Sequence, residues 1–223
     1  MKIFYIISNK KHSGKTYLAS NIVESIKILG KSVCYYKPFV MEVKDNKLFD
    51  SEYIKNTTTL NASDIFVSYA TNGNLSPLHS INTKIDERDV TDLIDECKKV
   101  YDYMVLESLC LYDPIKENYS FLDLIMDIER YDNEIHIIPM VEYDTNVIHS
   151  SLEQVELFHQ RGFKIPFIVI NIKKDVFVQN EVIEYIRRQI SPIKLHTTIF
   201  DNFAESKKIL EIKYPNIIMQ LIK

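Results

Sequence analysis

An apolar run at the start of the chain leads directly into a loop that ends in Gly-Lys-Thr. The run covers residues 3–7, and residues 8–16 read Ser-Asn-Lys-Lys-His-Ser-Gly-Lys-Thr. A buried strand, a loop and a following helix form the arrangement in which backbone N–H groups surround phosphates at a helix N-terminus. In such a loop the lysine, here Lys15, reaches the β- and γ-phosphates, and the hydroxyl, here of Thr16, binds Mg²⁺. The segment therefore predicts a P-loop that holds a nucleoside triphosphate.

The match covers the second half of the P-loop pattern. The first glycine of the full pattern is replaced by polar residues, because the positions ahead of Gly14 hold Ser8, Asn9, Lys10 and Lys11. The residues that we expect around the phosphates are Lys11, His12, Ser13, Gly14, Lys15 and Thr16. The alternative is an ordinary exposed turn before a helix. The strand before the loop and the long helical pattern after it favour the P-loop.

Composition limits the classes of protein to which the chain can belong. Its 223 residues are 46% hydrophobic and 26% charged, which is typical of a globular protein with one substantial core, and we expect one domain over 1–223. A net charge of −4 argues against a nucleic-acid partner, and no apolar stretch is long enough to span a membrane.

The run 3–7 lacks a signal-peptide cleavage site, which predicts a cytoplasmic protein. Three cysteines without Cys-x-x-Cys spacing predict neither a disulfide framework nor a zinc site.

Short apolar runs alternate with helical patterns along the chain. The runs cover residues 3–7, 33–36, 103–106, 135–138, 167–170 and 198–200. The helical patterns cover residues 15–29, 51–58, 88–100, 147–161, 176–190 and 205–221. Strands that alternate with helices predict a doubly wound, mostly parallel α/β sheet flanked by helices, of the P-loop NTPase type. The irregular stretch 60–86 is interpreted as a loop on the substrate side.

Polar residues follow several of the predicted strands. Lys37 follows the second, Glu107 the third, Glu142 the fourth and Asn171 the fifth. Because ligands in open α/β sheets gather at the carboxyl ends of the strands, these residues and the P-loop are expected to converge on one edge of the sheet.

These motifs together resemble those of dethiobiotin synthetases. The P-loop follows the first strand, Lys37-Pro38 ends the second, Ser76-Pro77-Leu78-His79 precedes a helix, Glu107 ends the third, and Val169-Ile170-Asn171 ends a later one. Their order and spacing agree over nearly the whole chain. The resemblance implies a homodimeric enzyme of biotin biosynthesis that uses ATP and Mg²⁺. It closes the cyclic urea of dethiobiotin from 7,8-diaminopelargonic acid and CO₂.

The resemblance also implies roles for individual residues. Lys15 holds the β- and γ-phosphates, and Lys37 contacts the carbamate and the transferred phosphoryl group. Thr16 and Glu107 bind Mg²⁺ together with a second acid, for which Asp50 and Glu52 are both candidates. Asn171 reads the adenine edge. From the residues alone, a surface lysine before a proline turn is the better explanation of Lys37, and Asn171 is equally a turn residue that closes a strand.

Two features leave other functions open. The family has Gly-Ala-Gly-Gly after its acid, whereas Glu107 is followed by Ser108-Leu109-Cys110-Leu111, whose side chains are expected to obstruct the approach of substrate. This difference fits a divergent synthetase, a changed substrate or a catalytically inactive relative. In addition, Lys10 lies five residues before Lys15, which resembles the P-loop of ParA/MinD proteins. That resemblance implies a nucleotide-switched ATPase that binds a partner.

Overall fold

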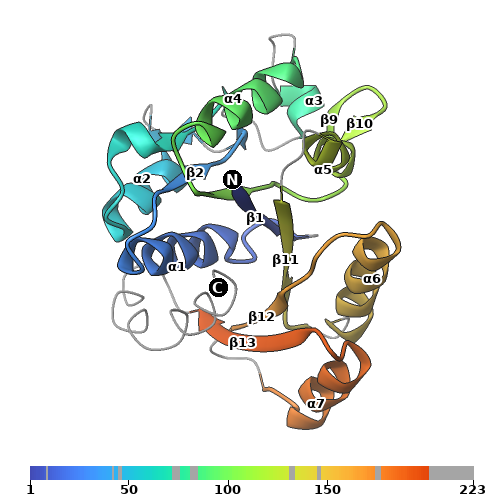
Figure 1. The fold of residues 1–223 in the computed structure, drawn as a ribbon. Coiled ribbons are helices and arrows are strands. Elements are labelled where there is room, and N and C mark those ends of the chain that lie inside the picture. Colours follow the sequence, from blue (N-terminus) through green and yellow to red (C-terminus); the bar gives the residue numbers. More distant parts are fainter. Residues whose placement is uncertain are drawn as a thin grey trace.

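The computed structural model describes residues 1–8, 10–41, 43–44, 47–71, 76–80, 85–130, 134–144, 147–173 and 177–200. Within these residues the centre of the fold is a seven-stranded sheet (Figure 1), whose strand order is β13-β12-β11-β1-β8-β2-β6. All of its neighbouring strands pair in parallel, which confirms the predicted sheet. The strands are β1 (Lys2–Ile7), β2 (Val33–Tyr36), β6 (Ile65–Phe66), β8 (Tyr103–Glu107), β11 (Glu134–Glu142), β12 (Phe167–Lys173) and β13 (Lys194–Phe200).

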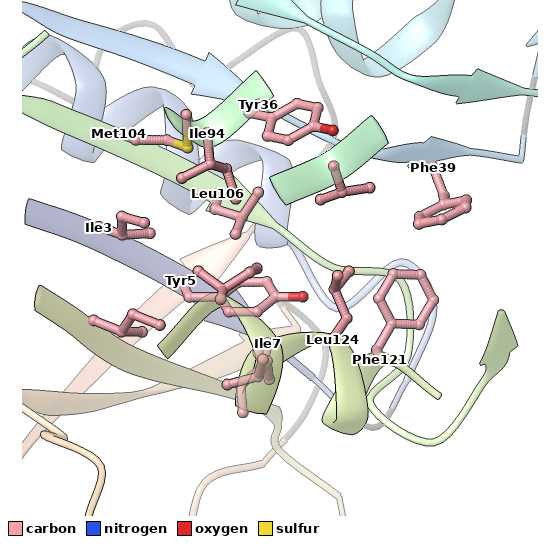
Figure 2. Packing of buried hydrophobic residues seen from close by; sticks show 14 of the residues in the cluster. Ile3, Tyr5, Ile7, Tyr36, Phe39, Ile94, Met104, Leu106, Phe121 and Leu124 are labelled. Carbon is pink, nitrogen blue, oxygen red and sulfur yellow. The ribbon is translucent and has the colours of Figure 1, made fainter. Parts of the chain in front are cut away.

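Strand β1 lies in the middle of the sheet, between β8 and β11. Its residues alternate between two cores because successive side chains of a strand point to opposite faces. Ile3, Tyr5 and Ile7 pack with α4 (Arg88–Lys98) and α5 (Phe121–Arg130), as Figure 2 shows. Phe4 and Ile6 pack with α1 (Lys15–Ile28) on the other face. A strand that is buried on both faces reads as a continuous apolar run, as this one does.

Helices cover both faces of the sheet. Helix α1 shares a core with α2 (Phe49–Thr57) through Ile54. On the opposite face, α6 (Val147–Gln160) and α7 (Asn180–Gln189) pack on β12 through a third cluster that includes Val147, Ile183 and Ile186. This arrangement confirms the doubly wound α/β fold.

The helix boundaries follow the predictions closely where the structure describes them. Helices α1, α4 and α6 end within two residues of the predicted ends. Helix α2 begins two residues earlier than predicted, and α7 begins four residues later than predicted, at Asn180. After α1, Gly30 adopts a φ of 70° and donates its N–H to the Lys27 carbonyl, as expected of a helix C-cap glycine. The helix predicted over 205–221 lies outside the described residues.

The stretch 60–86, interpreted from the sequence as an irregular loop, contains short regular elements where the structure describes it. The structure forms a 3-10 turn η1 (Ala62–Asp64), then β6 and β7 (Tyr69–Ala70), and a short helix α3 (Pro77–Ser80). Strand β6 extends the sheet beside β2, and β7 pairs with β3 (Phe39–Val40). These strands are only two residues long, so local periodicity carries almost no signal for them.

Helix α5 was missed, although its pattern is present in the sequence. Phe121, Leu124, Ile125 and Ile128 are buried and recur at helical spacing, so they form one apolar face. Two short antiparallel hairpins complete the described elements: β4 (Val43–Lys44) with β5 (Lys47–Leu48), and β9 (Pro114–Lys116) with β10 (Tyr119–Ser120). Among the helices that the structure describes, none combines the length and apolar character that a bilayer crossing requires.

Candidate functional site

The loop between β1 and α1 is closed by its own polar groups. Ser8 directly follows β1, and it is buried. Its hydroxyl donates to the Lys10 carbonyl and accepts from the Lys10 N–H, each at 3.1 Å. Gly14 caps α1 with a φ of 96°, in the left-handed region that favours glycine. Hydrogen bonds between Ser8 and Lys10 therefore close the loop before it leads into the N-terminus of α1.

Lys15 is buried at the first position of α1. Its ammonium Nζ donates to the Lys10 carbonyl at 3.1 Å. Burial lowers the pKa of Lys15 below its ordinary value; Glu107 acts in the opposite direction, and the positive charge of Lys37 adds to the decrease. A phosphate beside Lys15 would favour the charged ammonium, so the residue is suited to an anionic ligand.

Four side chains from four different segments meet beside this lysine. The Thr16 hydroxyl lies 3.0 Å from Asp50 Oδ1 and 3.0 Å from Glu107 Oε1. The Lys37 ammonium lies 2.6 Å from Asp50 Oδ2 and 2.7 Å from Glu107 Oε1. Glu107 and Lys37 are almost fully buried, with side chains that are 1% and 6% exposed. The structure therefore brings together the P-loop, the end of β2, the start of α2 and the end of β8.

Strand register explains why Lys37 and Glu107 meet. Strands β2 and β8 are parallel neighbours, in which Tyr36 lies beside Leu106. The next residue on each strand is Lys37 and Glu107, so both polar side chains leave the sheet at the same level. Burial alone would lower the pKa of Lys37, but the charges of Glu107 and Asp50 and the hydrogen bonds to both raise it above its usual value. The ammonium therefore stays charged between the two carboxylates.

Asp50, rather than Glu52, is the acid that contacts both Thr16 and Lys37. Helix α2 carries both residues in its first turn, and the sequence did not distinguish them. The two carboxylates and the hydroxyl are hard oxygen donors, and Mg²⁺ commonly takes one or two carboxylates together with phosphate oxygens and water. Within the described residues, no three or more His, Cys, Asp or Glu side chains form a metal-binding group. The donor set therefore fits Mg²⁺ that arrives with a nucleotide.

Tyr35 belongs to this cluster and was missed in the sequence. Its hydroxyl donates to Glu107 Oε2 at 2.7 Å, and the residue is fully buried. Burial and the negative charge of Glu107 raise the pKa of Tyr35 well above its ordinary value, so the hydroxyl keeps the proton that it donates. A signal was available, because residues two apart on a strand share a face, which places Tyr35 on the face of Lys37.

Asn171 lies beside the P-loop, within β12 and two residues before the strand ends. Its Nδ2 donates to the Ser13 carbonyl at 2.9 Å. Among the described residues, its buried Oδ1 has no hydrogen-bond partner, and neither does the buried Ser13 hydroxyl. The amide is therefore held by its nitrogen, and its unpaired group is an acceptor.

The remaining predicted residues surround this centre. Lys11 is half-buried, and His12 is exposed with a φ of 54°. Lys10 donates to Glu142 Oε1 at 2.9 Å, and this hydrogen bond raises the pKa of Lys10. The contact ties the P-loop to the end of β11. The predicted convergence is thus seen for Lys37 after β2, for Glu107 and Glu142 at the ends of β8 and β11, and for Asn171 within β12.

The segment after Glu107 packs mainly inward. Leu109 and Leu111 are buried in the core that contains α5, and the Leu111 N–H donates to the Ser8 carbonyl at 3.2 Å. Ser108 is also buried, and Cys110 is half-buried. The side chains of Leu109 and Leu111, which stand where the family has alanine and glycine, therefore fill the core beneath the P-loop.

Replacing Asp50 by asparagine is expected to cost stability in a pH-dependent way. Burial raises the pKa of Asp50, but the charge of Lys37 and the hydrogen bonds from Lys37 and Thr16 outweigh it, so the net pKa is lowered. A carboxyl group of this kind stabilises the fold above its unfolded pKa, near about 3.9, and loses that contribution as the pH falls through its folded pKa. The difference in unfolding free energy between wild type and Asp50→Asn should therefore shrink between about pH 5 and about pH 2.

Urea titrations across that range measure the difference. The Lys37→Met background is the control, because the pH dependence of Asp50→Asn should diminish when the cation that lowers the Asp50 pKa is absent. A difference that stays constant with pH in the wild-type background would contradict the prediction.

Comparison with known proteins places this geometry in a family. The family model AAA_26, described as an AAA domain, matches residues 2–199. The chain belongs to this family. It is similar to the ATP-dependent dethiobiotin synthetase BioD of Methanocaldococcus jannaschii, with 21% identity over 97% of this chain and 100% of that protein. It is also similar to BioD of Akkermansia muciniphila, with 23% identity over 78% of this chain and 80% of the relative. The chain is thus a divergent dethiobiotin synthetase-like P-loop protein.

Solved structures share the fold. The MinC:MinD cell division protein complex of Aquifex aeolicus matches 100% of this chain and 96% of its own, with a TM-score of 0.58 and 15% identity. A ParA family ATPase from Chlorobium tepidum matches 100% of this chain and 98% of its own, with a TM-score of 0.56 and 14% identity. At these identities the likeness is one of fold, and it agrees with an α/β fold of the P-loop NTPase type.

Proposed function

We propose that this AAA_26 protein is an ATP- and Mg²⁺-dependent dethiobiotin synthetase, which acts on 7,8-diaminopelargonic acid and CO₂. One observation carries the proposal: the Lys37 ammonium lies 2.7 Å from Glu107 and 2.6 Å from Asp50, beside the Thr16 hydroxyl at the start of α1. A lysine at this position can face a phosphoryl group and a carbamate held above the P-loop. The similarity to curated BioD proteins supports the choice of substrate.

The proposed reaction has three steps. A substrate amine adds to CO₂ and loses a proton, which gives a carbamate. A carbamate oxygen then attacks the γ-phosphorus of ATP, and ADP leaves. Finally, the second amine attacks the carbamate carbon, phosphate leaves, and loss of a proton completes the cyclic urea. Negative charge is carried on phosphoryl and carbamate oxygens throughout, so positioned cations supply most of the stabilisation.

The residues divide this work by position. Lys15, buried at the helix start, holds the β- and γ-phosphates. Lys37 stabilises charge on the carbamate and on the transferred phosphoryl group. Thr16, Asp50 and Glu107 hold Mg²⁺, which offsets the negative charge of the phosphates when it is bound.

Asn171 is proposed to bind the base. Because its Nδ2 is engaged with the Ser13 carbonyl, Oδ1 is the group that remains to accept a hydrogen bond. An acceptor at this point matches the exocyclic amino group of adenine and opposes the carbonyl of guanine. Lys11, His12, Ser13 and Gly14 complete the proposed contacts to the phosphates. We also propose that residues 1–223 form one domain and that the protein is a homodimer.

A second candidate is a nucleotide-switched ATPase that binds a partner, as in the ParA/MinD class. Lys10 in the P-loop favours it, since its side chain is 54% exposed. Its ammonium pairs with Glu142 of the same chain at 2.9 Å, so a role across a dimer would require this pair to separate. A catalytically inactive relative of the synthetases is the third candidate, because the segment after Glu107 lacks the glycines that the family has there.

The deciding experiment is product formation measured by mass spectrometry. Purified protein is incubated with diaminopelargonic acid, bicarbonate, Mg²⁺ and ATP, with Lys15→Met and an amine-free reaction as controls. We expect dethiobiotin in the complete reaction with wild type and none with Lys15→Met. ATP hydrolysis that is independent of the amine and lost in Lys10→Ala would instead support the switch ATPase. Neither product nor hydrolysis would support a changed substrate or an inactive relative.

A further inference from the structure

The two oxygens of Glu107 have separate partners. Oε1 lies 2.7 Å from the Lys37 ammonium and 3.0 Å from the Thr16 hydroxyl. Oε2 lies 2.7 Å from the Tyr35 hydroxyl. Strand register accounts for the second contact, because Tyr35 lies beside Val105 on the neighbouring strand, and Glu107 is the next residue of β8 on that face. Oε2 is therefore held by a hydrogen bond from β2, whereas Oε1 faces the P-loop.

A hydrogen bond of this kind restricts rotation of the carboxylate. Without it, Glu107 could turn about its terminal bond and offer either oxygen, or both, to a cation. The Tyr35 donor is fully buried, so water does not compete for Oε2. Outer residues that orient ligands in this way contribute strongly to metal affinity at other sites.

We propose that Tyr35 is a positioning residue, which fixes Glu107 so that Oε1 alone faces Thr16, Lys37 and the divalent cation that accompanies the nucleotide. This inference rests on the proposed function, because it assumes that Glu107 is a metal ligand. It goes beyond that function, since it assigns single-oxygen ligation and names the residue that enforces it.

The competing explanation is that Tyr35 only satisfies a buried carboxylate and supports the fold. The neighbouring residue provides a matched control for this. Tyr36 is also fully buried on β2, and its hydroxyl lies 2.6 Å from the Ser68 hydroxyl. It points to the opposite face, into the core that contains α4 and α5. Tyr36→Phe therefore removes the same group at the same burial but away from Glu107.

The test measures Mn²⁺ binding by electron paramagnetic resonance in the presence of saturating ADP. Wild type is compared with Tyr35→Phe, Tyr36→Phe and Glu107→Gln. We expect Tyr35→Phe to weaken Mn²⁺ binding about tenfold and Tyr36→Phe to leave it unchanged. ADP affinity in the presence of EDTA should be the same in wild type and Tyr35→Phe, because Tyr35 acts through the metal ligand alone. If Tyr35→Phe does not fold, Tyr35→Met removes the same hydroxyl with a side chain that adapts to irregular space.

The outcomes separate this inference from the proposed function. If wild type binds Mn²⁺ and Glu107→Gln weakens that binding, the metal site stands. Equal effects of Tyr35→Phe and Tyr36→Phe, or no effect of Tyr35→Phe, then overturn the positioning role alone. If wild type binds no Mn²⁺ with ADP, or if Glu107→Gln binds it as tightly as wild type, both the metal site and the positioning role are overturned.

Discussion

Replacing Glu107 by alanine is expected to lower the free energy of unfolding of the nucleotide-free protein by about 3–5 kcal/mol. The reason is the environment of Lys37, whose ammonium lies 2.7 Å from Glu107 Oε1 at a position where both side chains are buried. Removing the carboxylate leaves the ammonium with Asp50 as its remaining anionic contact among the described residues, and an incompletely compensated buried charge is costly. Urea unfolding at neutral pH, followed by circular dichroism, measures the change.

Two comparisons test the cause of that loss. The double variant Lys37→Met/Glu107→Leu should regain part of the stability, because it also removes the ammonium that Glu107→Ala leaves incompletely compensated. The recovery is partial, since the Tyr35 hydroxyl and Asp50 each lose a partner. Glu184→Ala removes the partner of Arg187 on the exposed face of α7, and it should cost less than about 1 kcal/mol. A loss for Glu107→Ala that is as small as the loss for Glu184→Ala would contradict the buried ion pair described for the site.

Replacing Lys15 by methionine is expected to have opposite effects on nucleotide affinity and on the stability of the nucleotide-free protein. Affinity for ATP should fall about 30-fold or more, since losing one partner of a buried charge pair costs about 2–5 kcal/mol. Stability without nucleotide should hold or rise, because the variant removes a buried ammonium whose described hydrogen bond is to the Lys10 carbonyl. Calorimetry gives the affinity, and urea unfolding with and without ATP gives the stability.

The pH dependence of the same variant provides an internal check. Burial lowers the pKa of Lys15 in the folded state, so the unfolded chain binds more protons between the folded value and the ordinary value, near about 10.4. Wild type should therefore gain stability relative to Lys15→Met as the pH rises through that interval. Lys27→Met, near the other end of α1, is the control for a general effect of losing a lysine from this helix. Unchanged ATP affinity in Lys15→Met would rule out the phosphate-binding role.

Local sequence patterns predicted much of the fold. The apolar run of β1, the Gly14 cap and the helical pattern of α1 are all short-range features, and they predicted the P-loop unit within one residue of its observed helix end. The same kind of signal was present for α5 but was overlooked. The two-residue strands β6 and β7 were missed for a physical reason, because a pair of residues shows no periodicity and pairs only when its neighbour strand is in place.

The candidate site was predicted in part. Thr16, Lys37 and Glu107 were expected at one edge of the sheet, because each follows a strand end or opens the first helix, and the structure brings them within hydrogen-bond distance. The choice of Asp50 over Glu52 required the orientation of α2 against the P-loop. That orientation depends on tertiary packing, in which Ile54 of α2 is buried with α1.

The sequence by itself determined which residues carry charge, which runs are apolar, and where a phosphate-binding loop meets a helix, since these depend on composition and short-range order. Only the tertiary structure decided that β2 lies beside β8. That pairing joins Lys37 to Glu107 across 70 positions of the chain and brings the Tyr35 hydroxyl to the same carboxylate across 72. The physical reason is that strand pairing and burial are long-range. A lysine before a proline is an ordinary surface residue until a neighbouring strand places a carboxylate beside it and excludes water from both.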